Sequence, residues 1–239
     1  MRRCSEVLER LAAEKRWLAK LLRLLPVLYS RDDVHGLGHV VRVTCLALRL
    51  AGERGDVDVI LAAGLLHDVG RGAEESTGLH HAILSAVYAE DILSSIGFPE
   101  EKIGAVVDAV LAHSYSLGYR PYSLEAAALS DADKLDALGA IGVYRASAEG
   151  YRRGRGVAGT IKHYYEKLSR LADLLVLEES RKVAEERVKL LDSFFAELEE
   201  ETGDERGVIE YIDELVRSAG AHITAARAQR RSTSSARPG

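Results

Sequence analysis

The segment LAAGLLHDVG, residues 61–70, joins an aliphatic run to a histidine, an aspartate and a glycine. Such a run is typical of a buried helix, and His67 and Asp68 follow at its C-terminal end. Buried His and Asp side chains are costly unless something satisfies their polar atoms. An isolated His-Asp pair more often caps a helix at the surface, so its interpretation depends on the rest of the chain.

The composition is that of a globular protein with a helical bias. The chain has 239 residues, of which 47% are hydrophobic and 29% charged, and it contains four prolines. Abundant Ala, Leu, Glu and Arg, with little alternation of β-branched residues, predict an all-α fold with little or no β structure. The formal net charge of -5 argues against nucleic acid as a partner.

The cysteines and the hydropathy pattern bear on the cellular compartment. Cys4 and Cys45 are far apart in the sequence and too few for a disulfide framework, so a reducing, cytoplasmic location is expected. We find no signal-peptide pattern and no apolar run long enough to span a bilayer, so no membrane association is expected.

Breaks in the helical pattern predict four segments. They are an N-terminal helix packed on the domain (residues 1–29), the main helical domain (30–201), a C-terminal helix after Gly203 (202–228) and a disordered tail (229–239). The main domain should end in long amphipathic helices. Its Glu- and Lys-rich part, 178–201, could pair with a second copy as a homodimer or pack on its own domain.

Side chains that commonly bind metals recur near the ends of the expected aliphatic helices. They are His39, His67 with Asp68, His81, His113, and Asp131 with Asp133. Imidazoles combined with carboxylates suit a divalent metal such as Mn, Fe, Co, Ni, Zn or Mg. His35 precedes His39 by four residues and would share its helix face, so we expect it to support the site.

The order His39, His67-Asp68, Asp133 resembles the H…HD…D signature of the HD-domain metal-dependent phosphohydrolases. The segments HVVRV (39–43) and AGLLHDVGR (63–71) are similar to motifs of that family. DADKLDALGAIG (131–142) and HYYEKL (163–168) resemble a small prokaryotic branch of predicted HD hydrolases. The resemblance covers about residues 30–200 and implies an HD-domain helical bundle. It makes a surface cap a poor explanation of the His-Asp pair.

The resemblance also implies roles for individual residues. His39, His67, Asp68 and Asp133 correspond to the metal ligands, because the family's last ligand is the Asp directly before a basic residue. Asp131 is then structural, or an acceptor for a ligand histidine. His81 and His113 match additional histidines that hold a second metal in some relatives and contact substrate phosphate in others. They could equally be core histidines bonded to the backbone.

A metal-dependent phosphohydrolase acting on nucleotides is therefore expected, with phosphate or pyrophosphate released by a metal-activated water. Asp68 would orient the water and Lys134 would offset phosphoryl charge. Arg71, Arg145, Lys167 and His113 are the expected substrate contacts, although Arg42 and Arg145 could instead form ion pairs. We expect the loop residues Arg152, Arg153 and Arg155 to be solvated or salt-bridged cations, and Tyr115, Tyr119 and Tyr122 could stack a base or pack locally. The alternatives are a di-iron oxygenase on the same scaffold and a non-catalytic nucleotide sensor.

Overall fold

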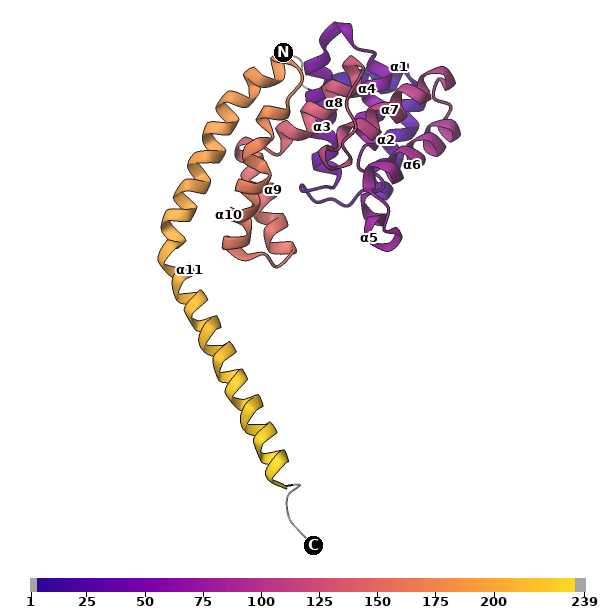
Figure 1. Ribbon diagram of the computed structural model, residues 1–239. Helices are drawn as coiled ribbons and strands as arrows, with labels where there is room; N and C mark the ends of the chain where they lie inside the picture. Colours follow the sequence, from indigo (N-terminus) through magenta and orange to yellow (C-terminus); the bar gives the residue numbers. More distant parts are fainter. Residues whose placement is uncertain (1–3, 235–239) are drawn as a thin grey trace. The chain divides into compact units, whose positions relative to one another are not determined.

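The structure is a computed structural model that describes the backbone of residues 4–234 and the side chains of 4–217, apart from Asp204 and Arg206. Only helices and turns occur among these residues, which confirms the all-α prediction (Figure 1). The α-helices are α1 (Cys4–Glu14), α2 (Arg16–Leu28), α3 (Leu37–Ala51), α4 (Val57–Leu66), α5 (Glu74–Thr77), α6 (His81–Ile96), α7 (Ile103–His113), α8 (Leu124–Asp136), α9 (Gly139–Arg152), α10 (Gly156–Glu166) and α11 (Glu178–Ser234). The chain divides into two compact units, Met1–Phe194 and Phe195–Gly239.

The core of the first unit is a set of aliphatic helices around α4. Helices α3, α7 and α8 all pack against α4, and α3 also packs against α8. Leu61, Leu65 and Leu66 of α4 are fully buried, as is Leu129 of α8. Burial of one such side chain contributes about 1.5–3 kcal/mol relative to its exposure. The core therefore fixes the ends of these helices relative to one another.

Helix α4 begins after a capping aspartate and ends at the His-Asp pair. Asp56 caps its N-terminus, since its side chain accepts hydrogen bonds from the backbone N–H groups of Asp58 and Val59. The helix ends at Leu66, so His67 and Asp68 lie in the turn that follows it. The turn leads into a short 3₁₀ helix, Arg71–Ala73.

Two glycines allow neighbouring helices to approach the His-Asp turn closely. A Cβ atom on Gly64 would lie 2.6 Å from Thr44 Oγ1, so α3 could not pack at its present distance from α4. A Cβ atom on Gly70 would lie 2.5 Å from the backbone nitrogen of Ser85 in α6. The Gly70 N–H instead donates to Ser85 Oγ at 2.9 Å. These small residues hold the turn among three helices.

The two ends of the chain depart from the expected segments. Within the expected N-terminal helix, the described residues form two helices, α1 and α2, and Pro26 lies within α2. The expected break at Gly203 is absent because one glycine in a helix costs only about 1 kcal/mol, and α11 continues to Ser234. The helical backbone of α11 includes residues 229–234 of the segment expected to be a disordered tail, and 235–239 lie outside the described residues. Ser180, Ala184 and Leu191 of α11 are buried, which favours packing of this part on its own domain.

Cys4 of α1 and Cys45 of α3 form a disulfide, with Cα atoms 5.8 Å apart. No disulfide framework was expected from two cysteines so distant in the sequence, but the packing of the N-terminal helices brings together these residues, 41 positions apart. Disulfides are rare in reducing compartments, so the cysteines no longer argue for a cytoplasmic location. Among the described residues, no helix combines the length and apolar character needed to cross a bilayer.

We predict that reduction destabilises the protein. The disulfide closes a loop across 41 positions, and the loss of that constraint on the unfolded chain costs about 4 kcal/mol in the chain-entropy account. Dithiothreitol should therefore lower the melting temperature on the order of 10 °C. The Cys4→Ser/Cys45→Ser variant is the control, since it should melt at the lower temperature with or without the reductant. Equal melting of the oxidised and reduced wild type would contradict the prediction.

Candidate metal centre

Four ligand-type side chains from three parts of the helical core converge. His39 comes from α3, His67 and Asp68 follow α4, and Asp133 comes from α8. The Nε2 atom of His39 lies 3.2 Å from His67 Nε2, 3.4 Å from Asp133 Oδ1 and 3.7 Å from Asp68 Oδ2. His39, His67 and Asp68 are buried, whereas the Asp133 side chain is 28% exposed. The structure thus brings together all four residues expected to bind a metal.

The hydrogen bonds of the two histidines determine which ring nitrogens face the centre. His67 donates from Nδ1 to the Gly64 carbonyl oxygen at 2.8 Å, because that oxygen can only accept. His39 likewise donates from Nδ1 to Asp136 Oδ2 at 2.8 Å. Burial lowers the pKa of His67 to about 3, so its ring is neutral near pH 7. The Nε2 atoms of the two rings face each other at 3.2 Å, an arrangement that a positive charge between them would stabilise.

Asp136 belongs to this centre, although no motif in the sequence singled it out. Its buried carboxylate accepts from His39, from Arg42 Nε at 2.8 Å and from Arg145 Nη1 at 3.1 Å. Burial alone would raise the pKa of Asp136, but the hydrogen bonds from His39 and Arg42 outweigh it and lower that pKa. A usable signal was present, since Asp136 follows Asp133 by three residues and shares its helix face.

Asp131 has a different partner from the one considered in the sequence analysis. Its carboxylate accepts from the backbone N–H groups of Val176 and Leu177, at 2.9 and 2.8 Å. It therefore holds the segment before α11, and it is not the acceptor for a ligand histidine. Arg42 is an ion-pair residue, since its guanidinium binds Asp136 and Asp33.

Arg71 binds the Asp68 carboxylate through two hydrogen bonds. The guanidinium donates from Nε to Asp68 Oδ2 at 2.8 Å and from Nη2 to Oδ1 at 3.0 Å. Burial alone would raise the pKa of Asp68, but the charge of Arg71 outweighs it and holds that pKa well below its ordinary value. Asp68 is therefore a carboxylate near neutral pH. His35, expected to support the site, has its Nδ1 atom 3.3 Å from Asp68 Oδ2.

The two additional histidines differ in how their ring nitrogens are used. His81 has Nε2 3.0 Å from Arg71 Nη2 and Nδ1 3.2 Å from Glu74 Oε1, so both its nitrogens are engaged. Burial, followed by the charge of Arg71, lowers the pKa of His81 to about 4. His113 donates from Nδ1 to the Val110 carbonyl oxygen at 2.5 Å. Its buried Nε2 has no hydrogen-bond partner among the described residues and lies 3.6 Å from Asp68 Oδ1.

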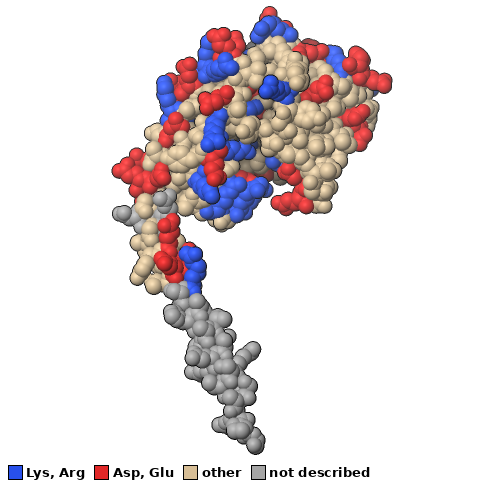
Figure 2. All heavy atoms as spheres, viewed as in Figure 1, with Lys and Arg blue, Asp and Glu red and all other residues tan. Residues whose placement is uncertain are grey.

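A cavity of about 270 Å³ adjoins this centre, and Asp133 is part of its wall. The cationic side chains that line it are Arg71, Lys134, Arg145, Arg153, Arg155 and Lys167. Carboxylates are fewer there, namely Glu74, Asp133 and Glu149. Figure 2 shows Lys and Arg atoms clustered on one part of the first unit. The excess of positive charge suits an anionic ligand.

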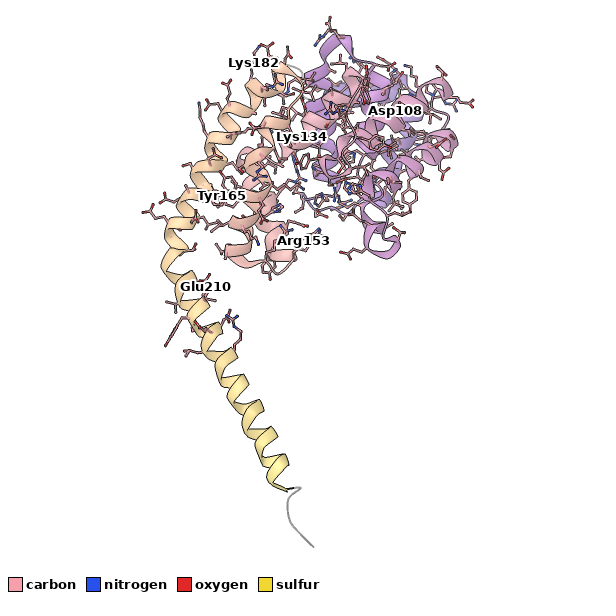
Figure 3. The ribbon with its side chains drawn as sticks, in the orientation of Figure 1. Asp108, Lys134, Arg153, Tyr165, Lys182 and Glu210 are labelled. Atoms are coloured by element: carbon pink, nitrogen blue, oxygen red, sulfur yellow. A yellow bond between two sulfur atoms is a disulfide. The ribbon has the colours of Figure 1, made fainter. Side chains whose placement is uncertain are left out.

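The loop between α9 and α10 contributes more to the cavity than expected. Arg153 and Arg155 line it, and Arg153 also forms an ion pair of the expected kind, with Glu149; Figure 3 labels Arg153 in this loop. Arg152 is not among the lining residues; it pairs with Glu149 and is 65% exposed. Tyr115 lines the cavity, whereas Tyr119 and Tyr122 are exposed residues away from its wall.

The basic residues singled out from the sequence line the cavity and differ in their hydrogen bonds and surroundings. Lys134 donates from Nζ to the carbonyl oxygen and the hydroxyl of Ser130, at 3.1 and 2.6 Å. Arg145 donates to the Val34 carbonyl oxygen at 2.9 Å as well as to Asp136. Burial lowers the pKa of Lys167.

Comparison with known proteins connects this centre to a family. The HD domain family matches residues 36–138, which include all four converging residues and Asp136. The uncharacterized protein YpgQ of Bacillus subtilis (strain 168) is 30% identical over 185 residues, covering 73% of this chain and 88% of YpgQ. The crystal structure of Bacillus subtilis YpgQ in complex with ADP is similar, with a TM-score of 0.63 and 26% identity over 78% of this chain and 97% of that chain.

A further solved structure, a predicted HD superfamily hydrolase from an uncultured Thermotogales bacterium, has a TM-score of 0.61 and 27% identity. The match covers 81% of this chain and 98% of that chain. The family match, the relative and the shared helical architecture agree with the convergence of His and Asp residues at the core. This chain therefore belongs to the HD-domain superfamily of metal-dependent phosphohydrolases.

Proposed function

We propose that the protein hydrolyses a phosphate ester or anhydride of a nucleotide, with a divalent cation held by His39, His67, Asp68 and Asp133. One observation carries the proposal: the Nε2 atoms of His39 and His67 face each other at 3.2 Å beside two carboxylates, next to a cationic cavity. This mixed nitrogen and oxygen donor set suits Mn, Co, Ni, Mg, Fe or Zn. A bound divalent cation lowers the pKa of a water ligand and polarises a phosphoryl oxygen.

The surrounding residues prepare the donors for this task. Asp136 accepts the Nδ1 hydrogen of His39 and thereby directs Nε2 toward the centre. Arg71 keeps Asp68 ionised, which is the form that binds a cation and accepts a hydrogen bond from the attacking water. We assign Lys134, adjacent to Asp133 in α8, to the offset of negative charge on the phosphoryl oxygens.

The cavity supports a phosphorylated substrate, and a relative supports a nucleotide. Arg71, Arg145 and Lys167 line it and are the proposed phosphate contacts. Because Nδ1 of His113 is the donor to the Val110 carbonyl, its unpartnered Nε2 offers a lone pair that can bind a second cation or accept a hydrogen bond from a substrate hydroxyl. The YpgQ crystal structure contains ADP, which favours a nucleotide as the ligand of this chain as well. Removal of phosphate and of pyrophosphate are the two reactions that fit such a substrate.

We predict that hydrolysis requires both the cation and His67. Protein stripped of metal should be inactive toward a panel of nucleoside mono-, di- and triphosphates, and Mn, Co, Ni or Mg should restore phosphate or pyrophosphate release. His67→Ala should abolish that release because it removes one of the two facing Nε2 donors. His80→Asn is the control, since His80 caps α6 through a side-chain acceptor that Asn preserves.

Activity that survives in a folded His67→Ala protein would refute the assignment. Oxygen consumption by an iron-loaded protein without phosphate release would instead favour the oxygenase. Nucleotide binding without turnover for any metal would favour the sensor.

We predict that substitution of Asp136 weakens metal binding, whereas substitution of Asp131 lowers stability. Asp136→Asn should weaken metal binding about 10–100-fold, because His39 loses the carboxylate that orients it. Asp131→Asn should cost about 1 kcal/mol of stability through weaker bonds to the Val176 and Leu177 amides, but leave metal affinity unchanged. Calorimetric metal titration and thermal melts measure the two effects. Equal losses of metal affinity in both variants would contradict this division.

We predict that Lys167 contributes to substrate binding. Lys167→Met removes one cation from the cavity wall and should raise KM for a nucleoside triphosphate about 10–100-fold, the range for a lost hydrogen bond to a charged group. Lys162→Met is the matched control, since Lys162 is 72% exposed and is not part of that wall. Steady-state kinetics on both variants test the prediction, which fails if the two have the same KM.

A further inference from the structure

The second unit carries an exposed apolar stripe on α11. Val208, Ile209, Ile212 and Val216 are 57%, 50%, 49% and 65% exposed. Their spacing of three, four and seven residues puts them on one side of a helix. Helices in proteins gain most of their stability by packing an apolar face against a partner. We therefore expect a partner surface to cover this stripe, and the charged residues next to the stripe indicate which partner it is.

The charges on the two sides of the stripe are opposite in sign. Between positions 197 and 214 the sequence contains nine acidic residues and one arginine, and six of the nine precede the stripe. Between positions 217 and 239 it contains five arginines and no acidic residue. The helical backbone continues to Ser234, so much of the basic stretch extends the same helix. Figure 3 labels Glu210 within the acidic stretch.

We propose that α11 pairs with α11 of a second copy in an antiparallel arrangement, with the two apolar stripes in contact at the centre. In this orientation the acidic stretch of each copy lies against the basic stretch of the other. A parallel pair would place acid against acid and base against base. The overlap of residues 197–231 would extend for about 50 Å at 1.5 Å per residue.

A second copy fits these observations better than an unrelated basic partner. A two-fold axis at the stripe uses the same surface on both copies, so one symmetric contact satisfies the acidic and the basic stretch of each chain. An unrelated basic helix would cover only the acidic stretch and leave the basic one without opposite charge. The arrangement is independent of the proposed catalytic activity.

Sedimentation velocity on the full-length protein over a range of concentrations tests the pairing. We expect a dimer that Ile212→Glu weakens at least about tenfold in Kd, since it places a charge within an apolar contact. Nucleotide hydrolysis and thermal melting of the first unit should stay unchanged. Val27→Glu is the control, because Val27 is an 85% exposed apolar residue of α2 and lies outside the stripe.

A wild-type protein that is monomeric at every concentration would overturn the proposal. So would a dimer that Val27→Glu dissociates and Ile212→Glu does not, because the dimer would then use another surface.

Charge exchange tests the orientation. Glu197→Arg, Glu200→Arg and Glu201→Arg together should weaken self-association at least about tenfold, as should Arg227→Glu, Arg230→Glu and Arg231→Glu together. All six substitutions in one chain should restore the dimer, since antiparallel copies again oppose unlike charges. Failure of the six-substitution protein to dimerise, with an intact helical circular dichroism spectrum, would contradict the antiparallel orientation.

Discussion

The bond between His39 Nδ1 and the Asp136 carboxylate is the interaction on which the centre depends. It orients the His39 ring so that Nε2 faces His67. Arg42 and Arg145 donate to the same buried carboxylate. A buried carboxylate is costly to desolvate, and these donors offset that cost. The same cluster therefore stabilises the packing of α3 on α8 and prepares a donor for a cation.

Helix ends, more than helix faces, bring the chemistry together. His67 and Asp68 follow the last residue of α4, and His113 is the last residue of α7. Gly64 and Gly70 keep neighbouring helices close enough for these groups to meet. Aliphatic packing positions the backbone, and the polar side chains of the centre lie at or near the helix ends.

The cavity carries most of the positive charge, and the centre carries the side chains that could bind a metal. Arg71 belongs to both, since it lines the cavity and grips Asp68. Lys167, an expected substrate contact, and the loop residues Arg153 and Arg155 come from the segment after α8. Their contribution to the wall depends on how α9 and α10 fold over the core, and no local pattern specifies that.

The sequence by itself determined the helical class, through its periodicity, and the resemblance of its motifs to the HD-domain family implied that His39, His67, Asp68 and Asp133 share one site. Periodicity and motifs are local properties of a chain, so both can be read without a structure. Only the tertiary structure decided that Asp136 orients His39, that Asp131 holds the segment before α11, and that Cys4 meets Cys45. Each of these contacts joins residues tens of positions apart. Such contacts follow from the way whole helices pack, so a residue's neighbours along the chain do not identify its distant partner.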